Sequence, residues 1–134
     1  MLIMAWDDMQ EMTTGTPKQL QWKELREQLA SNVRKYLWDN ERKKFIPHIY
    51  LDKSPIPAGF NELEVYYHGA TAVAIEAGLL SKEEIAIVNK QMVENVRLSG
   101  MPSIGLTLYP TYPEGFFHGV MSKPYAYQTG GDWT

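Results

Sequence analysis

Two helical segments joined by a very short connection constrain the fold of this chain more than any other feature. The first, residues 62–77, carries almost no charge from Val65 to Ile75, and its alanines let another helix approach closely. The second, residues 82–99, repeats apolar residues at helical spacing on one face: Ile85, Val88, Met92 and Val96. We therefore expect an αα-hairpin with an inner helix buried on most sides and an amphipathic outer helix.

Capping signals mark the ends of both helices. Asn61 and Ser81 each precede a glutamate at the spacing of a capping box. Gly78 and Gly100 follow the last helical positions, where a residue in the left-handed conformation commonly ends a helix.

An earlier helix is predicted over residues 17–38. Thr16 is a capping residue, and Pro17 suits the first helical position because an N–H there would have no helical partner. Apolar residues recur at helical spacing and predict one buried stripe, formed by Trp22, Leu25, Leu29, Val33 and Tyr36. The aromatic and β-branched stretch 44–51 then predicts a short hairpin or an extended arm, in which Pro47 allows only an edge strand.

The helical period is absent from residues 101–134, where prolines alternate with aromatic residues. Long segments of this kind inside compact domains are usually functional or disordered. The density of aromatic residues argues against disorder. We expect the stretch from Tyr109 to Trp133 to be a functional surface.

Composition excludes several classes of protein. The net charge is −3, and 13 basic residues are interspersed with 16 acidic ones, so no surface is built for nucleic acid. The absence of cysteine excludes disulfides, thiolate catalysis and cysteine-bound zinc. No apolar run approaches the roughly 20 residues of a membrane helix, and the start lacks a signal-peptide pattern. The expected location is cytoplasmic by default, or secreted or periplasmic if the chain is a fragment that has lost its leader.

Four features follow one another in a distinctive order. They are a helix ending Leu37-Trp38-Asp39, an extended arm, an Ala-rich helix ending Glu76-Ala77-Gly78-Leu79-Leu80-Ser81, and the string Gln128-Thr129-Gly130-Gly131-Asp132-Trp133. This order resembles the six-hairpin glycosidases, which include trehalases, glucosidases, neutral invertases and bacterial amylo-glucosidase-like proteins. The last string is similar to a Tyr-x-Gln-x-Gly-Gly-x-Trp loop found in many members. The resemblance implies an all-α (α/α)6 toroid that acts on glycosides.

The resemblance also implies that the toroid is incomplete. A whole toroid has many more helices than the three predicted here, so residues 1–134 are expected to form a single partial toroid domain, as a fragment or a truncated relative. Inner helices would then be exposed on their flanks. We expect self-association through these exposed helix faces, or an incompletely ordered end.

Two carboxyl groups are candidates for catalysis. Inverting glycosidases place an acid and a base about 6.5 to 9.5 Å apart. The string Trp6-Asp7-Asp8 resembles the Trp-Asp string that carries the general acid in some of these families, which makes Asp7 a candidate; a solvated acidic pair is the alternative. Glu114, within the aromatic loop, is the second candidate, and a surface turn is the alternative interpretation.

Substrate binding is expected mainly in the same aromatic loop. An indole ring can stack on the apolar face of a sugar, while a neighbouring carboxylate accepts hydrogen bonds from its hydroxyls. The expected substrate-binding residues are Trp6, Tyr112, Phe116, Tyr125, Gln128, Asp132 and Trp133.

The histidines and the remaining acidic residues carry no predicted chemistry. Glu64 and His68 have the spacing of a shared helical face or a metal pair, but no third ligand is near in sequence, and His68 is interpreted as a packing residue. Capping and the helix dipole account for Glu62 and Glu64. His48 and His118 are isolated, although they can line the same face. We expect no metal and no cofactor.

Two hypotheses of function follow. The first is a segment of an inverting glycoside hydrolase that acts on oligosaccharides or glycosides and is inactive as an isolated chain. The second is a non-catalytic module that binds carbohydrate or assembles through its helices. Both hypotheses are kept, because fold-level analogy cannot choose between them.

Overall fold

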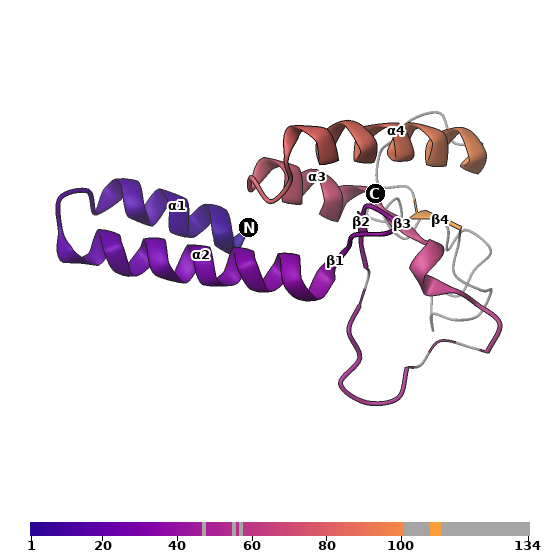
Figure 1. Ribbon diagram of the computed structural model, residues 1–134, viewed down its shortest axis with the longest axis horizontal. Helices are drawn as coiled ribbons and strands as arrows, with labels where there is room; N and C mark the ends of the chain where they lie inside the picture. The colour runs from indigo at the N-terminus through magenta and orange to yellow at the C-terminus, as the bar shows by residue number, and fades with distance from the viewer. Residues whose placement is uncertain (47, 55, 57, 101–107, 111–134) are drawn as a thin grey trace, which may run out of the picture.

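The computed structural model describes residues 1–46, 48–54, 56, 58–100 and 108–110. In this part of the chain, α-helices make up most of the regular structure, and the strands are only two residues long (Figure 1). The prediction of an all-α class is confirmed to the extent that the described chain is mostly helical. Completion of a toroid is not shown.

Helices α1 (Leu2–Met12) and α2 (Pro17–Leu37) lie side by side as a hairpin that projects from the rest of the molecule (Figure 1). The turn between them is closed by threonines, and Thr13 Oγ1 donates to the Met9 carbonyl at 2.6 Å. The predicted start of α2 at Pro17 is confirmed. The sequence did not predict α1, whose N-cap, Met1, offers no side-chain cap.

The apolar stripe of α2 is less buried than predicted. Trp22, Leu25, Leu29 and Val33 are half-buried, whereas Tyr36 is 55% exposed, and none of the residues of α2 is fully buried. The reason is that α1 covers only one side of a long helix.

A short hairpin follows α2, as predicted, but it begins at Trp38, before the predicted stretch 44–51. Strand β1 (Trp38–Asp39) pairs antiparallel with β2 (Lys44–Phe45), and Trp38 lies opposite Phe45. Asp39 Oδ1 accepts the N–H groups of Glu41 and Arg42 at 2.9 Å each, which fixes the turn.

The predicted helix 62–77 is wrong over its first part. A 3-10 turn, η1 (Glu62–Glu64), is followed by strand β3 (Tyr66–Tyr67), and helix α3 spans only His68–Glu76. Strand β3 pairs antiparallel with β4 (Leu108–Tyr109). Pairing with a distant strand therefore overrides the local capping pattern.

The predicted outer helix is confirmed as α4 (Lys82–Ser99). Ser81 and Glu84 form the complete capping box, and Gly100 ends the helix with φ 71°. The core of the described chain lies beneath this helix. Its buried residues are Leu80, Val88 and Met92, and Trp38, Phe45, Ile75 and Ile85 pack against them.

Helix α3 was predicted to be an inner helix buried on most sides, and in the described part of the chain it is not. Its buried side chains, His68, Thr71 and Ala74, lie on one face, while Val73 is 38% exposed. Among the described residues, this face carries the fully buried side chains of α3.

Two arginines of α2 connect the projecting hairpin to the α3–α4 pair. Arg26 Nη2 donates to the Ala77 carbonyl at 3.1 Å, just beyond the end of α3. Arg34 Nη2 lies 2.7 Å from Glu84 Oε1, in the first turn of α4. These contacts hold the two helical pairs in one arrangement.

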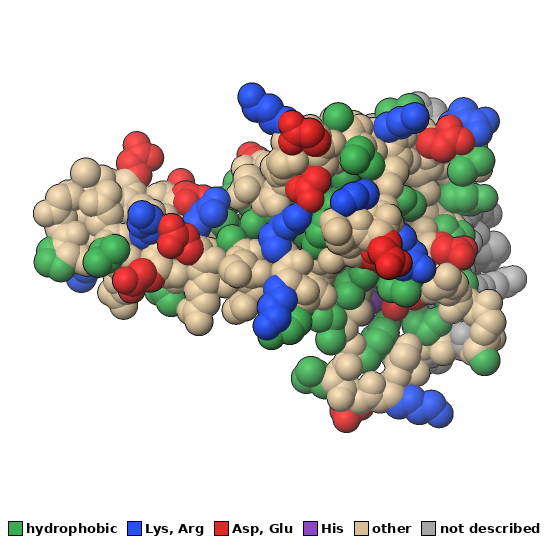
Figure 2. All heavy atoms as spheres, viewed as in Figure 1, with side chains coloured by type: hydrophobic (Ala, Val, Ile, Leu, Met, Phe, Trp, Pro, Cys, Tyr) green, Lys and Arg blue, Asp and Glu red, His purple; other side chains and the backbone are tan. Residues whose placement is uncertain are grey.

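Charges of both signs are interspersed over the face seen in Figure 2. Among the described residues, no helix combines the length and apolar character needed to cross a bilayer.

Candidate functional site

A buried carboxylate, that of Glu62, is the centre of the candidate site. The η1 turn holds this residue in place, and its side chain is only 10% exposed. Its Oε1 lies 2.6 Å from Nδ1 of His48, and its Oε2 accepts the Tyr50 hydroxyl at 2.8 Å. Because burying a carboxylate is costly without such partners, these two side chains keep Glu62 in its place.

This carboxylate lies at the wall of an open hollow of about 400 Å³. The volume lies within the range of small-molecule sites. The lining combines two aromatic rings, Tyr50 and Phe60, with polar groups of His48, Ser54 and Glu62. Within the described residues, neither lysine nor arginine lines it.

The imidazole of His48 is half-exposed and oriented by its neighbours. Its ring lies 6.0 Å from the ring of Tyr67 at 82° and 5.6 Å from that of Tyr50. When Nδ1 donates to Glu62, the neutral ring has Nε2 as a hydrogen-bond acceptor. A carboxylate that orients an imidazole in this way is the arrangement used for general base chemistry.

The phenol of Tyr50 acts as a hydrogen-bond donor. Burial and the hydrogen bond to Glu62 raise the pKa of Tyr50 to about 12. Its hydroxyl therefore keeps its proton at neutral pH.

Lys44 fixes the segment that carries Glu62. The side chain is 5% exposed, and Nζ donates to the carbonyls of Leu63 and Val65 at 2.7 Å each. Nζ also lies 4.0 Å from the ring centre of Tyr66. Burial lowers the pKa of Lys44 to about 8. Strand β2 is thereby attached to η1 and β3.

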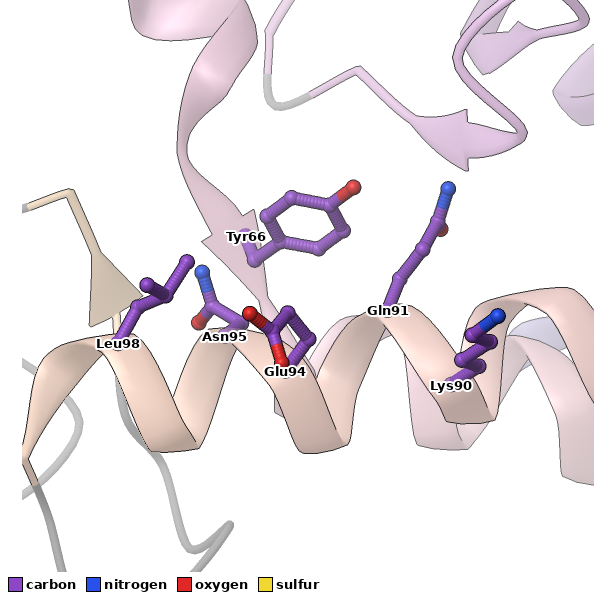
Figure 3. Close-up of a pocket in the computed structure, with 6 residues that line it drawn as sticks. All are labelled: Tyr66, Lys90, Gln91, Glu94, Asn95 and Leu98. Carbon is purple, nitrogen blue, oxygen red and sulfur yellow. The ribbon is translucent and has the colours of Figure 1, made fainter.

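A second hollow, of about 310 Å³, lies where Tyr66 faces α4 (Figure 3). Several of its polar groups already have partners within the protein: Glu94 pairs with Arg97, the Asn95 amide donates to the Tyr109 carbonyl at 2.9 Å, and Nε2 of Gln91 donates to the Arg42 carbonyl at 2.8 Å. We therefore consider this hollow a consequence of packing.

The buried imidazole of His68 contacts Asn95, one of the residues that line this second hollow. Nε2 is 2.8 Å from Asn95 Oδ1, and burial lowers the pKa of His68 although the bond to Asn95 acts to raise it. Its interpretation as a hydrogen-bonded packing histidine is confirmed. No group of three potential metal ligands is found in the described part of the chain.

Two of the predicted site residues, Trp6 and Asp7, lie in the described part of the chain. Asp7 is exposed on α1 and forms an ion pair with Arg26, with Oδ1 3.0 Å from Nε. Trp6, beside it, is half-buried. The other predicted residues lie outside the described ranges: Glu114, Tyr112, Phe116, Tyr125, Gln128, Asp132 and Trp133.

Sequence reasoning missed the cluster of His48, Tyr50 and Glu62. It assigned Glu62 to helix capping, whereas the carboxylate accepts hydrogen bonds from two side chains of the preceding arm. The available signal was an arm that carries a histidine and a tyrosine two residues apart, followed by an acidic turn.

Comparison of this chain with models of known protein families, with curated proteins and with solved structures finds no match. The function therefore has to be argued from the site itself.

Proposed function

We propose that this chain binds carbohydrate in the hollow beside Glu62, as a segment of a protein of six-hairpin glycosidase type. The observation that carries the proposal is the buried Glu62 carboxylate, which is hydrogen-bonded to His48 and Tyr50 at the wall of that hollow.

The chemistry of the hollow suits a sugar. Sugar hydroxyls donate to carboxylate oxygens, imidazole nitrogens and phenol oxygens, so Glu62, His48 and Tyr50 can each accept a hydrogen bond from a sugar, while the Tyr50 proton stays in the bond to Glu62. The rings of Tyr50 and Phe60 supply apolar surface that suits the C–H face of a pyranose. Convergent polar groups in a mainly apolar concavity are typical of small-molecule sites.

The glycosidase part of the proposal rests on the resemblance in the sequence. A helix, a hairpin arm and a helical pair follow one another in the described chain, which is compatible with one part of an (α/α)6 toroid. Asp7 and Glu114 remain the proposed acid and base. A panel of aryl glycosides tests this part, and we expect no turnover by the isolated chain.

The binding claim is tested by NMR. The full chain is titrated with glucose, galactose, mannose, maltose and cellobiose, and the ring signals of His48 and Tyr50 are followed. We expect at least one sugar to shift both sets of signals with a common saturation curve. The ring signals of Tyr36, which is exposed on α2, serve as the internal control and should not move. Unchanged His48 and Tyr50 signals at millimolar concentrations of every sugar contradict the proposal.

A helical assembly module is the second candidate, favoured by exposed apolar side chains on the α3–α4 pair. Val73, Ile87, Val93 and Leu98 are between 38% and 61% exposed. Association of two copies of the chain would cover such a surface. Sedimentation of the full chain tests it: a monomer over the whole concentration range contradicts assembly, and a dimer weakened by Val93→Lys supports it.

A further inference from the structure

We infer that the Glu62 hollow hydrolyses acetyl esters of the sugars that it binds, with His48 as the general base. This inference rests on the proposed function, because it adds a reaction to the site that holds the sugar. The substrate class is a sugar that carries an O-acetyl group.

The hydrogen bond of His48 determines which of its ring nitrogens can accept a proton. Nδ1 lies 2.6 Å from Glu62 Oε1, and because an ionised carboxylate only accepts hydrogen bonds, Nδ1 carries the proton of the neutral ring. Nε2, the other ring nitrogen, therefore holds the free lone pair. It makes no hydrogen bond within the described part of the chain.

The imidazole is held at the hollow by several contacts. The rings of Tyr67 and Tyr50 lie 6.0 Å and 5.6 Å from it, and the Glu62 carboxylate is itself fixed by the Tyr50 hydroxyl at 2.8 Å. His48 lines the hollow and is half-exposed, so solvent water reaches the ring. A fixed base with access to water meets the geometric requirement of general base catalysis.

Ester hydrolysis is a reaction that one imidazole and one water molecule can complete. Nε2 removes a proton from water while the water oxygen attacks the carbonyl carbon of the acetyl group. The tetrahedral intermediate then collapses, the bond from the carbonyl carbon to the sugar oxygen breaks, and the imidazolium returns its proton to that oxygen. The products are acetic acid and the free sugar hydroxyl, so no further reactant is consumed.

Water, rather than a serine, is assigned as the nucleophile. Ser54 also lines the hollow, where its Oγ accepts the Ile56 N–H at 3.2 Å. A serine nucleophile is activated by a hydrogen bond to the base. Among the described residues, no hydrogen bond joins Ser54 to His48.

The experiment measures acetate release by the full chain at neutral pH. The substrates are methyl glucoside and methyl galactoside, each acetylated at O6, the exocyclic oxygen that extends beyond the pyranose ring. We expect release above the buffer rate for at least one substrate. His48→Gln should lower the rate by about a hundredfold to ten-thousandfold. His68→Gln, which removes a packing imidazole, should keep the wild-type rate, and circular dichroism checks the fold of both variants.

Two measurements use the wild-type chain, so they do not depend on a variant that folds. Turnover should be slower in heavy water, because the attacking water loses a proton in the rate-limiting step. The nitrogen chemical shifts of His48 should show the proton on Nδ1. Glu62→Gln should give a mixture of the two tautomers and should lower turnover at saturating sugar by about tenfold or more, which separates the positioning role of Glu62 from its role in binding.

The outcomes separate this inference from the proposed function. Sugars that shift the His48 and Tyr50 signals while their acetyl esters stay intact overturn the inference and leave the proposed function standing. Acetate release that is unchanged in His48→Gln does the same. A chain that becomes acetylated during turnover, detected by its intact mass, overturns the assignment of water as the nucleophile. If no sugar shifts these signals and no acetate is released, both the inference and the proposed function are overturned.

Discussion

Nδ1 of His48 lies 2.6 Å from Oε1 of Glu62, although the two residues are 14 positions apart in the chain. The contact joins the arm after the β1–β2 hairpin to the η1 turn. Tyr50 adds a second bond to the same carboxylate. The cluster is therefore both a structural connection and the polar centre of the hollow, and its members can be tested separately.

Tyr50→Phe should destabilise the fold by about 1 kcal/mol, since it removes the donor to a buried carboxylate and leaves water to replace part of the bond. Tyr36→Phe is the matched control, because Tyr36 is 55% exposed on α2 and contacts Lys35 through its ring, which phenylalanine keeps. Urea denaturation of both variants measures the difference. Equal effects in the two variants would show that the Tyr50–Glu62 bond contributes nothing to stability.

Lys44 should make the protein more stable as the pH rises from about 8 towards 10.5. The native chain releases this proton at a pKa of about 8, whereas the unfolded chain retains it up to its ordinary value of 10.5. Between these values the unfolded state binds more protons, so the free energy of unfolding increases, by on the order of 1 to 3 kcal/mol.

The comparison is the pH dependence of unfolding in wild type and Lys44→Met, with the exposed Lys18→Met as the control. Lys44→Met should lose the rise, and Lys18→Met should keep it. A wild-type stability that falls over this pH range contradicts the account. It would mean that the two carbonyls and the Tyr66 ring stabilise the ammonium more than burial disfavours it.

Glu84→Gln should destabilise the chain by about 1 to 2 kcal/mol, because it breaks a partly buried ion pair with Arg34. Burial acts to raise the pKa of Glu84, but the Ser81 N–H and Arg34 outweigh it, so the pKa is lowered from 4.5. The contribution is therefore present above pH 4.5 and is lost as the pH falls through the native pKa.

The matched control is Glu94→Gln, which breaks the more exposed pair with Arg97 and should cost less than about 0.5 kcal/mol. Thermal or urea unfolding at pH 7 gives both values. If Glu94→Gln costs as much as Glu84→Gln, the connection between α2 and α4 is not the stabilising contact described above.

His68 should weaken the fold in mild acid. Its native pKa is lowered below the ordinary 6.5, so the unfolded chain takes up the proton first as the pH falls below that value. We expect the free energy of unfolding to decrease over this range in wild type. The decrease should be smaller in His68→Gln, which no longer titrates there. An unchanged slope in His68→Gln contradicts this role.

The sequence predicted the elements whose ends are marked by residues at or next to the helix terminus. Thr16-Pro17 marks the start of α2, Ser81 with Glu84 marks the start of α4, and Gly100 marks its end. Ser81 and Glu84 satisfy backbone N–H groups at the start of α4. At the start of α2 the Thr16 side chain makes no cap hydrogen bond, and the signal is Pro17, which has no N–H that needs a partner. Helix α1 has no such signal at its N-cap, and it was not predicted.

The remaining features depend on tertiary contacts that local patterns do not contain. Asn61 makes its local hydrogen bonds, with the Leu63 N–H and with Glu64, but the pairing of β3 with β4 delays the start of α3 to His68. The Glu62 cluster was missed for the same reason. Its partners are separated by a loop, so only the folded chain brings them together.

The central claim is that carbohydrate binds in the hollow beside Glu62. The most direct measurement is a calorimetric titration of wild type, Glu62→Gln and Glu94→Gln with whichever neutral sugar shifts the His48 and Tyr50 signals. We predict that Glu62→Gln weakens binding by about tenfold to a hundredfold, the value of a hydrogen bond to a charged group, while Glu94→Gln binds like wild type. Equal affinity of Glu62→Gln and wild type would contradict the claim.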